Sequence, residues 1–367
     1  MKISATSMAI LAAAAGGLFA SAATLSAATS YTFTAIPAML SGGSSGAYGI
    51  NDSGTVVGWA DSASGYRHAF SYSNGTMTDL GTLGGNTSEA YGINESGTVV
   101  GYSHTASGAY HAFSYSNGIM TDLGTLGGKY SQAYGINDSG TVVGWAATAS
   151  STHAFSYSNG TMTDLGTLPG GNLSGATGIN DSGTVVGYST HAFSYSNGTM
   201  TDLGTLPGWS SSTATGINDS GTVVGWADEA APGYSGAFIY SNGTMTSLAT
   251  LGGSSSYAYD INDSGTVVGE ADTVASYGYA HAFSYSDGTM ADLNSLTTNL
   301  PAGFVLVRAN AINNLGDIVG YGGYPQGTES EAFLLTPVPE PTGASLLALG
   351  IAGMFGMPLL KRRRRTA

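Results

Sequence analysis

The chain has 367 residues, of which only 9% are charged, and its 57 glycines and 22 tyrosines favour strands and turns over helices. It contains no cysteine, which excludes disulfides, thiolate nucleophiles and cysteine-ligated metal centres. Residues 29–338 carry three basic against 22 acidic side chains, and a body this acidic repels phosphate backbones, which excludes nucleic acid as a partner.

The first 28 residues have the form of a secretory signal peptide. Lys2 provides a positive charge, Met8 to Ala20 is apolar, and small residues follow, with cleavage expected after Ala23 or Ala28. The apolar stretch of about 13 residues is too short to span a bilayer, so a membrane anchor is the weaker interpretation. We therefore expect export and a folded body that begins near residue 29.

Seven repeats fill the chain between residues 29 and 337. The dipeptide Ile-Asn recurs at intervals of 43, 43, 43, 38, 44 and 51 residues, beginning at Ile50 and ending at Ile312. The dipeptide Ala-Phe recurs in step with it, from Phe70 to Phe333. Repeats of this length are typical of propeller blades.

Each repeat predicts four short strands, which the first repeat illustrates. They are Ala47 to Asn51, Thr55 to Trp59, His68 to Ser73 and Thr76 to Leu80. The sequence Asp-Ser-Gly at 52–54 supplies a turn between the first two strands, and Asn-Gly at 74–75 predicts a type I′ turn between the last two. The adjacent valines at 56–57 indicate a strand that is buried on both faces. Four antiparallel strands of this kind make one blade.

The two ends of the repeat series are complementary. The seventh repeat stops at Leu335 without a fourth strand, while Tyr31 to Ile36 precedes the first repeat and aligns with the fourth strand of the others. We therefore predict an all-β fold, a seven-bladed β-propeller of four-stranded antiparallel blades that the N-terminal strand closes without an open edge. A β-solenoid is the alternative, although it does not need complementary ends. Closure predicts that Tyr31 and Phe33 are buried together.

One position of the repeat supplies candidate ligand-binding residues. The residue after Val-Val-Gly, or Ile-Val-Gly in the last repeat, is aromatic in six repeats and acidic in one. The seven residues are Trp59, Tyr102, Trp145, Tyr188, Trp226, Glu270 and Tyr321. They border the loop between the second and third strands, which varies from 2 to 10 residues and marks the predicted ligand face. Stacking on sugar rings is the functional interpretation, and packing between blades is the other.

Histidines and acids also repeat, but without the pattern of a catalytic or metal site. The histidines near the start of the third strand are His68, His111, His153, His191 and His281. They belong to separate blades, whereas a metal needs three or four ligands at one point. The repeated acids fall in the first turn and the fourth strand, where turn chemistry and solubility explain them. No nucleophile elbow, phosphate loop or dinucleotide fingerprint occurs, so we expect no enzyme, no cofactor and no metal.

The repeat resembles the HAF family of extracellular repeats. The resemblance is carried by His-Ala-Phe at 68–70, Asp-Leu-Gly-Thr-Leu-Gly-Gly at 79–85 and Gly-Ile-Asn-Glu-Ser-Gly at 92–97, and it covers about residues 31–335. Gly236 in the fifth repeat and Glu331 in the seventh replace the histidine. The resemblance implies an extracytoplasmic repeat protein and no particular activity.

Residues 338–367 form a second targeting element in three parts. They are Pro339, Glu340 and Pro341, then an uncharged stretch over 342–360, then Lys361 with Arg362, Arg363, Arg364 and Arg365. The middle part has about the length that spans a bilayer, and the basic run would hold its end in the cytoplasm. This order resembles the PEP-CTERM sorting signal, which implies an exosortase as partner and an exopolysaccharide-producing, biofilm-forming bacterium. A simple membrane anchor is the alternative.

These features predict an inner-membrane-anchored precursor whose body ends outside the cell or on its surface. Its expected role is a non-enzymatic binding or structural module associated with exopolysaccharide or biofilm matrix, with polysaccharide or another surface protein as partner. A propeller enzyme acting on extracellular polysaccharide is the alternative. Two acids on one face, about 5–10 Å apart, would favour that alternative.

Overall fold

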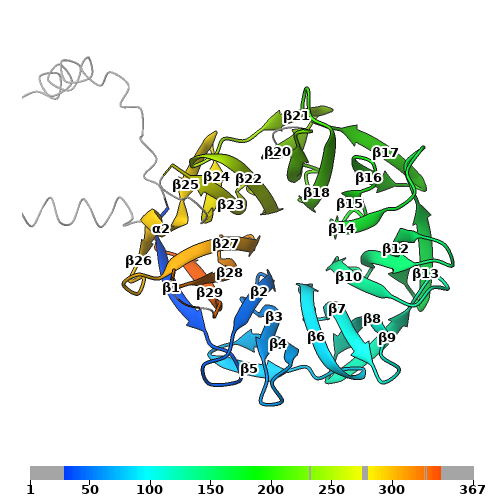
Figure 1. The fold of residues 1–367 in the computed structure, drawn as a ribbon, viewed down its shortest axis with the longest axis horizontal. Coiled ribbons are helices and arrows are strands. Elements are labelled where there is room, and N and C mark those ends of the chain that lie inside the picture. The colour runs from blue at the N-terminus through cyan, green and yellow to red at the C-terminus, as the bar shows by residue number, and fades with distance from the viewer. Residues whose placement is uncertain (1–28, 231–232, 275–279, 326, 328, 340–367) are drawn as a thin grey trace, which may run out of the picture.

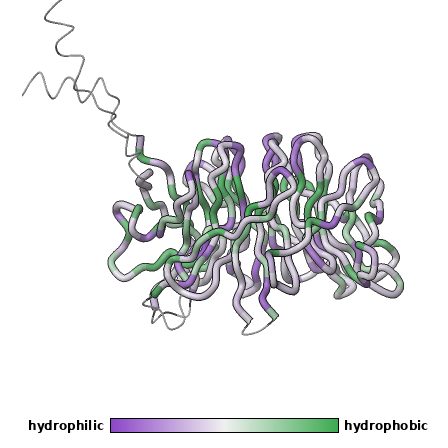
Figure 2. The backbone as a smooth tube through the Cα atoms, turned by 90° about the horizontal axis from the view of Figure 1, so that it is seen from above, coloured by the Kyte–Doolittle hydropathy of each residue, from purple (hydrophilic) through white to green (hydrophobic). Residues whose placement is uncertain are grey.

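The computed structural model describes residues 29–339 except 231–232, 275–279, 326 and 328. The predicted signal peptide over 1–28 and the sorting signal beyond Pro339, with the stretch at 342–360, lie outside the described residues. Across the described ranges no helix is long and apolar enough to cross a membrane. Seven sheets form a ring (Figure 1), which confirms the predicted seven-bladed β-propeller. Seen edge-on, the ring is a disc whose hydrophilic segments lie mainly at its two faces (Figure 2).

Each of the first six blades has four antiparallel strands, numbered outward from the ring axis. Blade 1 holds β2 (Ser45–Ile50), β3 (Val56–Asp61), β4 (Arg67–Ser73) and β5 (Thr76–Asp79). Blade 2 holds β6 (Gly84–Ile93), β7 (Val99–Thr105), β8 (Tyr110–Ser116) and β9 (Ile119–Gly124). Blade 3 holds β10 (Ser131–Ile136), β11 (Val142–Ala147), β12 (Thr152–Ser158) and β13 (Thr161–Gly166).

The second half of the ring repeats this order. Blade 4 holds β14 (Gly175–Ile179), β15 (Val185–Tyr188), β16 (Ala192–Ser196) and β17 (Thr199–Gly204). Blade 5 holds β18 (Ser211–Ile217), β19 (Val223–Asp228), β20 (Ser235–Ser241) and β21 (Thr244–Ser247). Blade 6 holds β22 (Gly252–Ile261), β23 (Val267–Thr273), β24 (Ala280–Ser286) and β25 (Thr289–Asp292), followed by helix α2 (Leu293–Leu296). Blade 7 holds β27 (Val305–Ile312), β28 (Ile318–Gly323) and β29 (Glu331–Pro337).

The N-terminal strand β1 (Tyr31–Ile36) closes the ring, as predicted. It pairs antiparallel with β29, from Tyr31 opposite Pro337 to Ile36 opposite Ala332. Tyr31 and Phe33 are 4% and 8% exposed, which confirms their predicted burial. A two-residue strand, β26 (Thr297–Thr298), adds an unpredicted parallel pairing on the outer edge of β1, so this sheet has five strands.

The predicted strand bounds differ from the structure by one or two residues. Asn51 lies just outside β2 because its side-chain oxygen accepts the N–H of Thr55 and closes the turn. Asn74 and Gly75 have φ angles of 51° and 79°, the two left-handed residues that a type I′ turn requires. The interblade loop predicted before blade 2 is partly strand, because β6 begins at Gly84 and extends alongside the end of β7.

Phenylalanines from the third strands fill the space between blades. All seven are 0% exposed: Phe70, Phe113, Phe155, Phe193, Phe238, Phe283 and Phe333. A buried serine links neighbouring blades beside this core. Ser88 accepts the N–H of Ala69 and donates to the carbonyl oxygen of Gly81, both in the segment before it. Ser45 makes the equivalent bonds to Ala332 and Ile36, so blade 1 is tied to blade 7 as the others are tied together.

The two faces of the disc carry different connections. The hairpin face has the two tight turns of each of the first six blades and the one of blade 7. The loop face has the loops between second and third strands and between blades. β29 ends and β1 begins at the hairpin face, where the N–H of Val338 donates to the carbonyl oxygen of Ser30 at 2.8 Å. The two ends of the described chain therefore leave the ring together.

A closed asparagine belt encircles the axis at the hairpin face. The Nδ2 of each asparagine donates to the backbone carbonyl oxygen of its counterpart in the next blade, at 3.1–3.2 Å, and the last returns to the first. Its members are Asn51, Asn94, Asn137, Asn180, Asn218, Asn262 and Asn313. The repeated Ile-Asn motif therefore joins blades as well as making turns.

An acidic belt lies next to the asparagine belt. The backbone N–H of each member donates to a side-chain oxygen of the next, at 2.6–3.0 Å. Its members are Asp52, Glu95, Asp138, Asp181, Asp219, Asp263 and Asn314. The role in turns that the sequence indicated for these residues explains them only in part, because their side chains also connect the blades.

Candidate functional site

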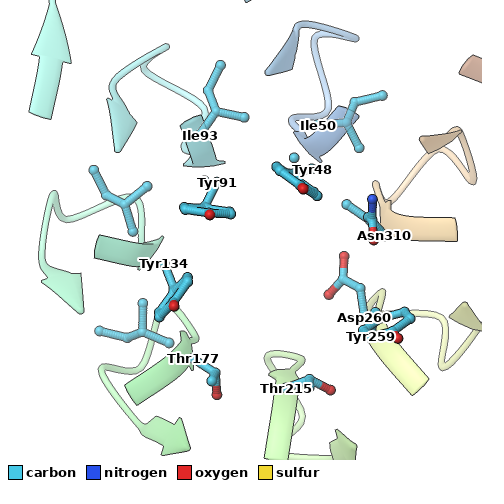
Figure 3. Close-up of a pocket in the computed structure, with 16 residues that line it drawn as sticks. Tyr48, Ile50, Tyr91, Ile93, Tyr134, Thr177, Thr215, Tyr259, Asp260 and Asn310 are labelled. Atoms are coloured by element: carbon cyan, nitrogen blue, oxygen red, sulfur yellow. The ribbon is translucent and has the colours of Figure 1, made fainter. Parts of the chain in front are cut away.

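A cavity of about 310 Å³ lies on the ring axis and is lined by the innermost strand of every blade. Tyrosines from four blades and shorter polar residues from three line its middle level (Figure 3). They are Tyr48, Tyr91, Tyr134, Thr177, Thr215, Tyr259 and Asn310. The axial wall is therefore aromatic in blades 1, 2, 3 and 6 and carries shorter polar side chains in blades 4, 5 and 7.

The candidate ligand residues lie closer to the loop face than the tyrosines and polar residues at the middle of the channel. Each is directly opposite a first-strand residue of its own blade. The seven cross-strand pairs are Gly46–Trp59, Glu89–Tyr102, Gln132–Trp145, Gly175–Tyr188, Thr213–Trp226, Tyr257–Glu270 and Arg308–Tyr321. No two of these pairs are the same, whereas the hairpin face repeats its residues almost without change.

Trp59 is 6% exposed and is packed inside the protein. Its ring lies against Gly46, where a Cβ atom would be 2.8 Å from the indole nitrogen. The indole N–H donates to the hydroxyl of Tyr48, and the guanidinium of Arg67 lies 3.8 Å from the ring centroid. Trp59 thus fits the packing interpretation.

The other five aromatic candidates are half-buried. Tyr188 lies over Gly175 as Trp59 lies over Gly46, and burial raises the pKa of its phenol to about 12. A ring that remains partly accessible beside a variable residue can contact a ligand. The structure therefore places an incomplete ring of accessible aromatic groups around the loop-face mouth of the channel.

Glu270, the exception among the candidates, forms an ion pair. Both of its carboxylate oxygens accept hydrogen bonds from Arg308 in the next blade, at 2.8 and 2.9 Å. The hydroxyl of Tyr259 also donates to Glu270 at 2.8 Å, and burial, then this carboxylate, raises the pKa of Tyr259. The sequence indicated that Glu270 was unusual but not its partner, since Arg308 lies 38 positions along the chain.

Asp260 is a feature of the channel that the sequence reasoning missed. It occupies the position held by glycine in the first five blades and by Ala311 in the last. Its carboxylate accepts the N–H of Ile312 across the blade boundary at 3.0 Å and that of Ile261 at 2.9 Å. Burial raises its pKa to about 6, although both hydrogen bonds oppose the shift. The replacement of a repeated glycine was the signal that could have found it.

The repeated histidines lie at the start of the third strands, away from the axis, as predicted, and His191 directly precedes its strand. Each pairs through Nδ1 with the fourth-strand aspartate of its own blade, at 2.8–3.0 Å. Blade 5 has Gly236 with Ser247 at the two positions, and blade 7 has Glu331 with Ala35, so histidine and aspartate are lost together. In the part of the chain that the structure describes, no three His, Asp or Glu side chains are arranged to hold a metal ion.

This architecture defines the class of protein, a β-propeller. The family described as "Protein of unknown function (DUF3466)" matches residues 200–329, about a third of the chain. No curated protein matches the sequence.

One solved structure shares the fold, and two others have lower similarity. The β-propeller domain of the Trilobed protease from Pyrococcus furiosus has a TM-score of 0.52 at 8% identity, covering 79% of this chain and 93% of that one. TolB from Acinetobacter baumannii has a TM-score of 0.41 at 9% identity, covering 74% and 60% of the two chains. An Aleuria aurantia lectin mutant has a TM-score of 0.37 at 12% identity, covering 73% and 100%. These likenesses concern the fold alone.

Proposed function

We propose that the protein is an exported, non-enzymatic binding or structural module of the cell surface or extracellular matrix. Its ligand class is polysaccharide, bound at the loop face around the mouth of the channel. The observation that carries this proposal is the one-sided distribution of differences between the repeats. Belts of nearly identical residues occupy the hairpin face, whereas seven different cross-strand pairs and loops of variable length occupy the other. Repeat proteins commonly place such variation on the binding face.

Loop grafting tests which face binds. The two-residue loop Ser189–Thr190 would replace Ala227–Ser235 and Ala271–Ala280, and binding to a glycan array would be compared with the parent. We expect the folded graft to lose binding, while substitutions in the Asn-Gly turns of the hairpin face leave it intact. The reverse result would mean that the ligand binds at the hairpin face and would contradict the proposed site. A parent that binds no glycan would contradict the polysaccharide assignment.

Delivery follows the resemblances to the HAF repeat and the PEP-CTERM signal. The precursor is held in the inner membrane through residues 342–360, and an exosortase cleaves near Pro339-Glu340-Pro341. Glu340→Ala, or deletion of Arg362 to Arg365, should leave an uncleaved precursor in the membrane fraction of the native host. Release of both variants at the parental rate would contradict this route.

A further inference from the structure

Three aromatic residues near blade 2 are not part of the repeat. Tyr110 occupies a position that is Arg67, Thr152, Thr190, Ser235, Ala280 or Ser330 in the other blades. His104, in blade 2, stands where blades 1 and 3 have Asp61 and Ala147. Tyr130, just before the first strand of blade 3, stands where blades 2 and 4 have Thr87 and Leu173. Independent departures from a nearly uniform repeat that meet at one place indicate a local purpose beyond the fold.

The three residues meet two candidate ligand residues at the boundary of blades 2 and 3. The ring centroid of Tyr110 lies 4.5 Å from that of Tyr130 and 5.8 Å from that of His104, with planes 20° and 26° apart. Tyr102 and Trp145 meet the same ring edge-on, at 5.7 and 6.2 Å. We call these five residues the aromatic platform. All five are half-buried, so part of each remains accessible.

The platform is continuous with the channel. Tyr102 lies 6.1 Å from Tyr91, which lines the axial cavity and stacks with Tyr48 at 5.1 Å. Aromatic groups therefore extend without interruption from the axis toward the rim of the loop face. Such a path suits an extended ligand better than a single small molecule.

The polar groups at the edge of the platform suit an uncharged, hydroxylated ligand. The exposed Lys129 holds its ammonium 5.3 Å from the centroid of Tyr130. Within the described ranges, Arg67 and Arg308 are ion-paired to glutamates, whereas Lys129 has no ion pair and keeps its donors for other acceptors. Phenols and an imidazole add further hydrogen-bonding groups. A polyanion would be repelled by a body with 22 acidic and three basic side chains.

We propose that the aromatic platform is a subsite for an uncharged pyranose chain that runs outward from the channel mouth. Pyranose rings have apolar faces for stacking and hydroxylated edges for Lys129 and His104. This inference rests on the proposed function, because it presupposes a glycan ligand on the loop face.

The test measures binding of the folded body to neutral and uronate oligosaccharides from monosaccharide to octasaccharide. Tyr110→Ala and Tyr130→Ala should each weaken binding of the longer neutral members about tenfold, the effect of losing one aromatic contact. Tyr110→Phe keeps the ring and should restore binding, which separates stacking from a folding defect. Ile119→Ala, an exposed apolar residue beside the Asn-Gly turn of blade 2 on the hairpin face, is the control and should bind as the parent does.

The outcomes separate the two proposals. If the parent binds neutral oligosaccharides and the two alanine variants bind equally well, the platform inference is wrong while the proposed function stands. If binding favours the uronate members and depends on Lys129, the uncharged ligand class is wrong. If the parent binds no glycan, the proposed function itself fails.

Discussion

The hairpin face and the loop face are built from the same repeats but are under different constraints. At the hairpin face each blade contributes the same asparagine and nearly always the same acid, because each side chain must reach an identical neighbour. At the loop face the first-strand residues include glycine, glutamate, glutamine, threonine, tyrosine and arginine. One face thus preserves the ring, and the other can differ from blade to blade without opening it.

This contrast depends first on closure, and breaking closure should have the largest effect. Replacing Tyr31 and Phe33 together by alanine removes two buried rings that share one face of β1, and should cost roughly 3–6 kcal/mol of unfolding free energy. Urea unfolding would measure the loss. Thr32→Ala with Thr34→Ala, two exposed positions on the same strand, is the control and should change little. An unchanged midpoint for the first pair would argue against a ring held by its N-terminal strand.

Two substitutions at opposite ends of β10 test the two faces directly. Asn137→Ala removes a hydrogen bond to Asn180 and two that its own oxygen accepts, from Thr141 and Ser139. With about 1 kcal/mol for each bond, we expect a loss of about 3 kcal/mol in the free energy of unfolding. Gln132→Ala, toward the loop face, removes one bond to Tyr134 and should cost no more than about 1 kcal/mol. Equal losses would mean that the faces are equally structural.

Asp260 lines the channel between the two faces, and its titration provides a third test. Its pKa rises from 3.8 to about 6 in the folded chain, so the folded state holds a proton that the unfolded state releases. Asp260 should therefore contribute its full stabilisation below about pH 4. Between about pH 4 and 6 the free energy of unfolding should fall as this contribution is lost, by at most about 3 kcal/mol.

The free energy of unfolding of Asp260→Asn, measured at several pH values in that window, should lose most of its dependence on pH. Asp287→Asn, a substitution at an exposed turn residue, is the control and should keep the pH dependence of the parent. A variant at position 260 with the parental slope would assign the pH dependence to other carboxyl groups.

The smallest effect is expected at the histidine–aspartate pairs near the rim. A double-mutant cycle on His153 and Asp164 should give a coupling of about 0.5 kcal/mol, since both groups are partly exposed. In blade 5 the histidine position is Gly236, so an aspartate introduced by Ser247→Asp would have no histidine to pair with. This substitution should not raise the free energy of unfolding. If the cycle shows no coupling, the joint loss of both residues in blades 5 and 7 has another cause.

Much of the fold could be predicted because its determinants are local. The Asn-Gly turns fix the outer hairpins, and the unmatched strand at Tyr31 to Ile36 fits the missing strand of the last repeat. Contacts between blades could not be predicted in this way, because Asn94 bonds to a residue 43 positions away and Asn313 to one 262 positions away. The aromatic platform was hidden for the same reason. His104, Tyr110 and Tyr130 are visible as departures in three segments, but only the folding of blade 2 and the packing of blade 3 on it bring them together.

The hydrogen bond between Ser30 and Val338 has a mechanical consequence. Because both ends of the described chain leave at one point of the hairpin face, a tether on either end pulls on the same sheet. In a chain attached to a surface through either end, as the proposed function holds, the two ends would act as one hinge at the hairpin face. The loop face, on the opposite side of the disc, would then be the face left free of the attachment.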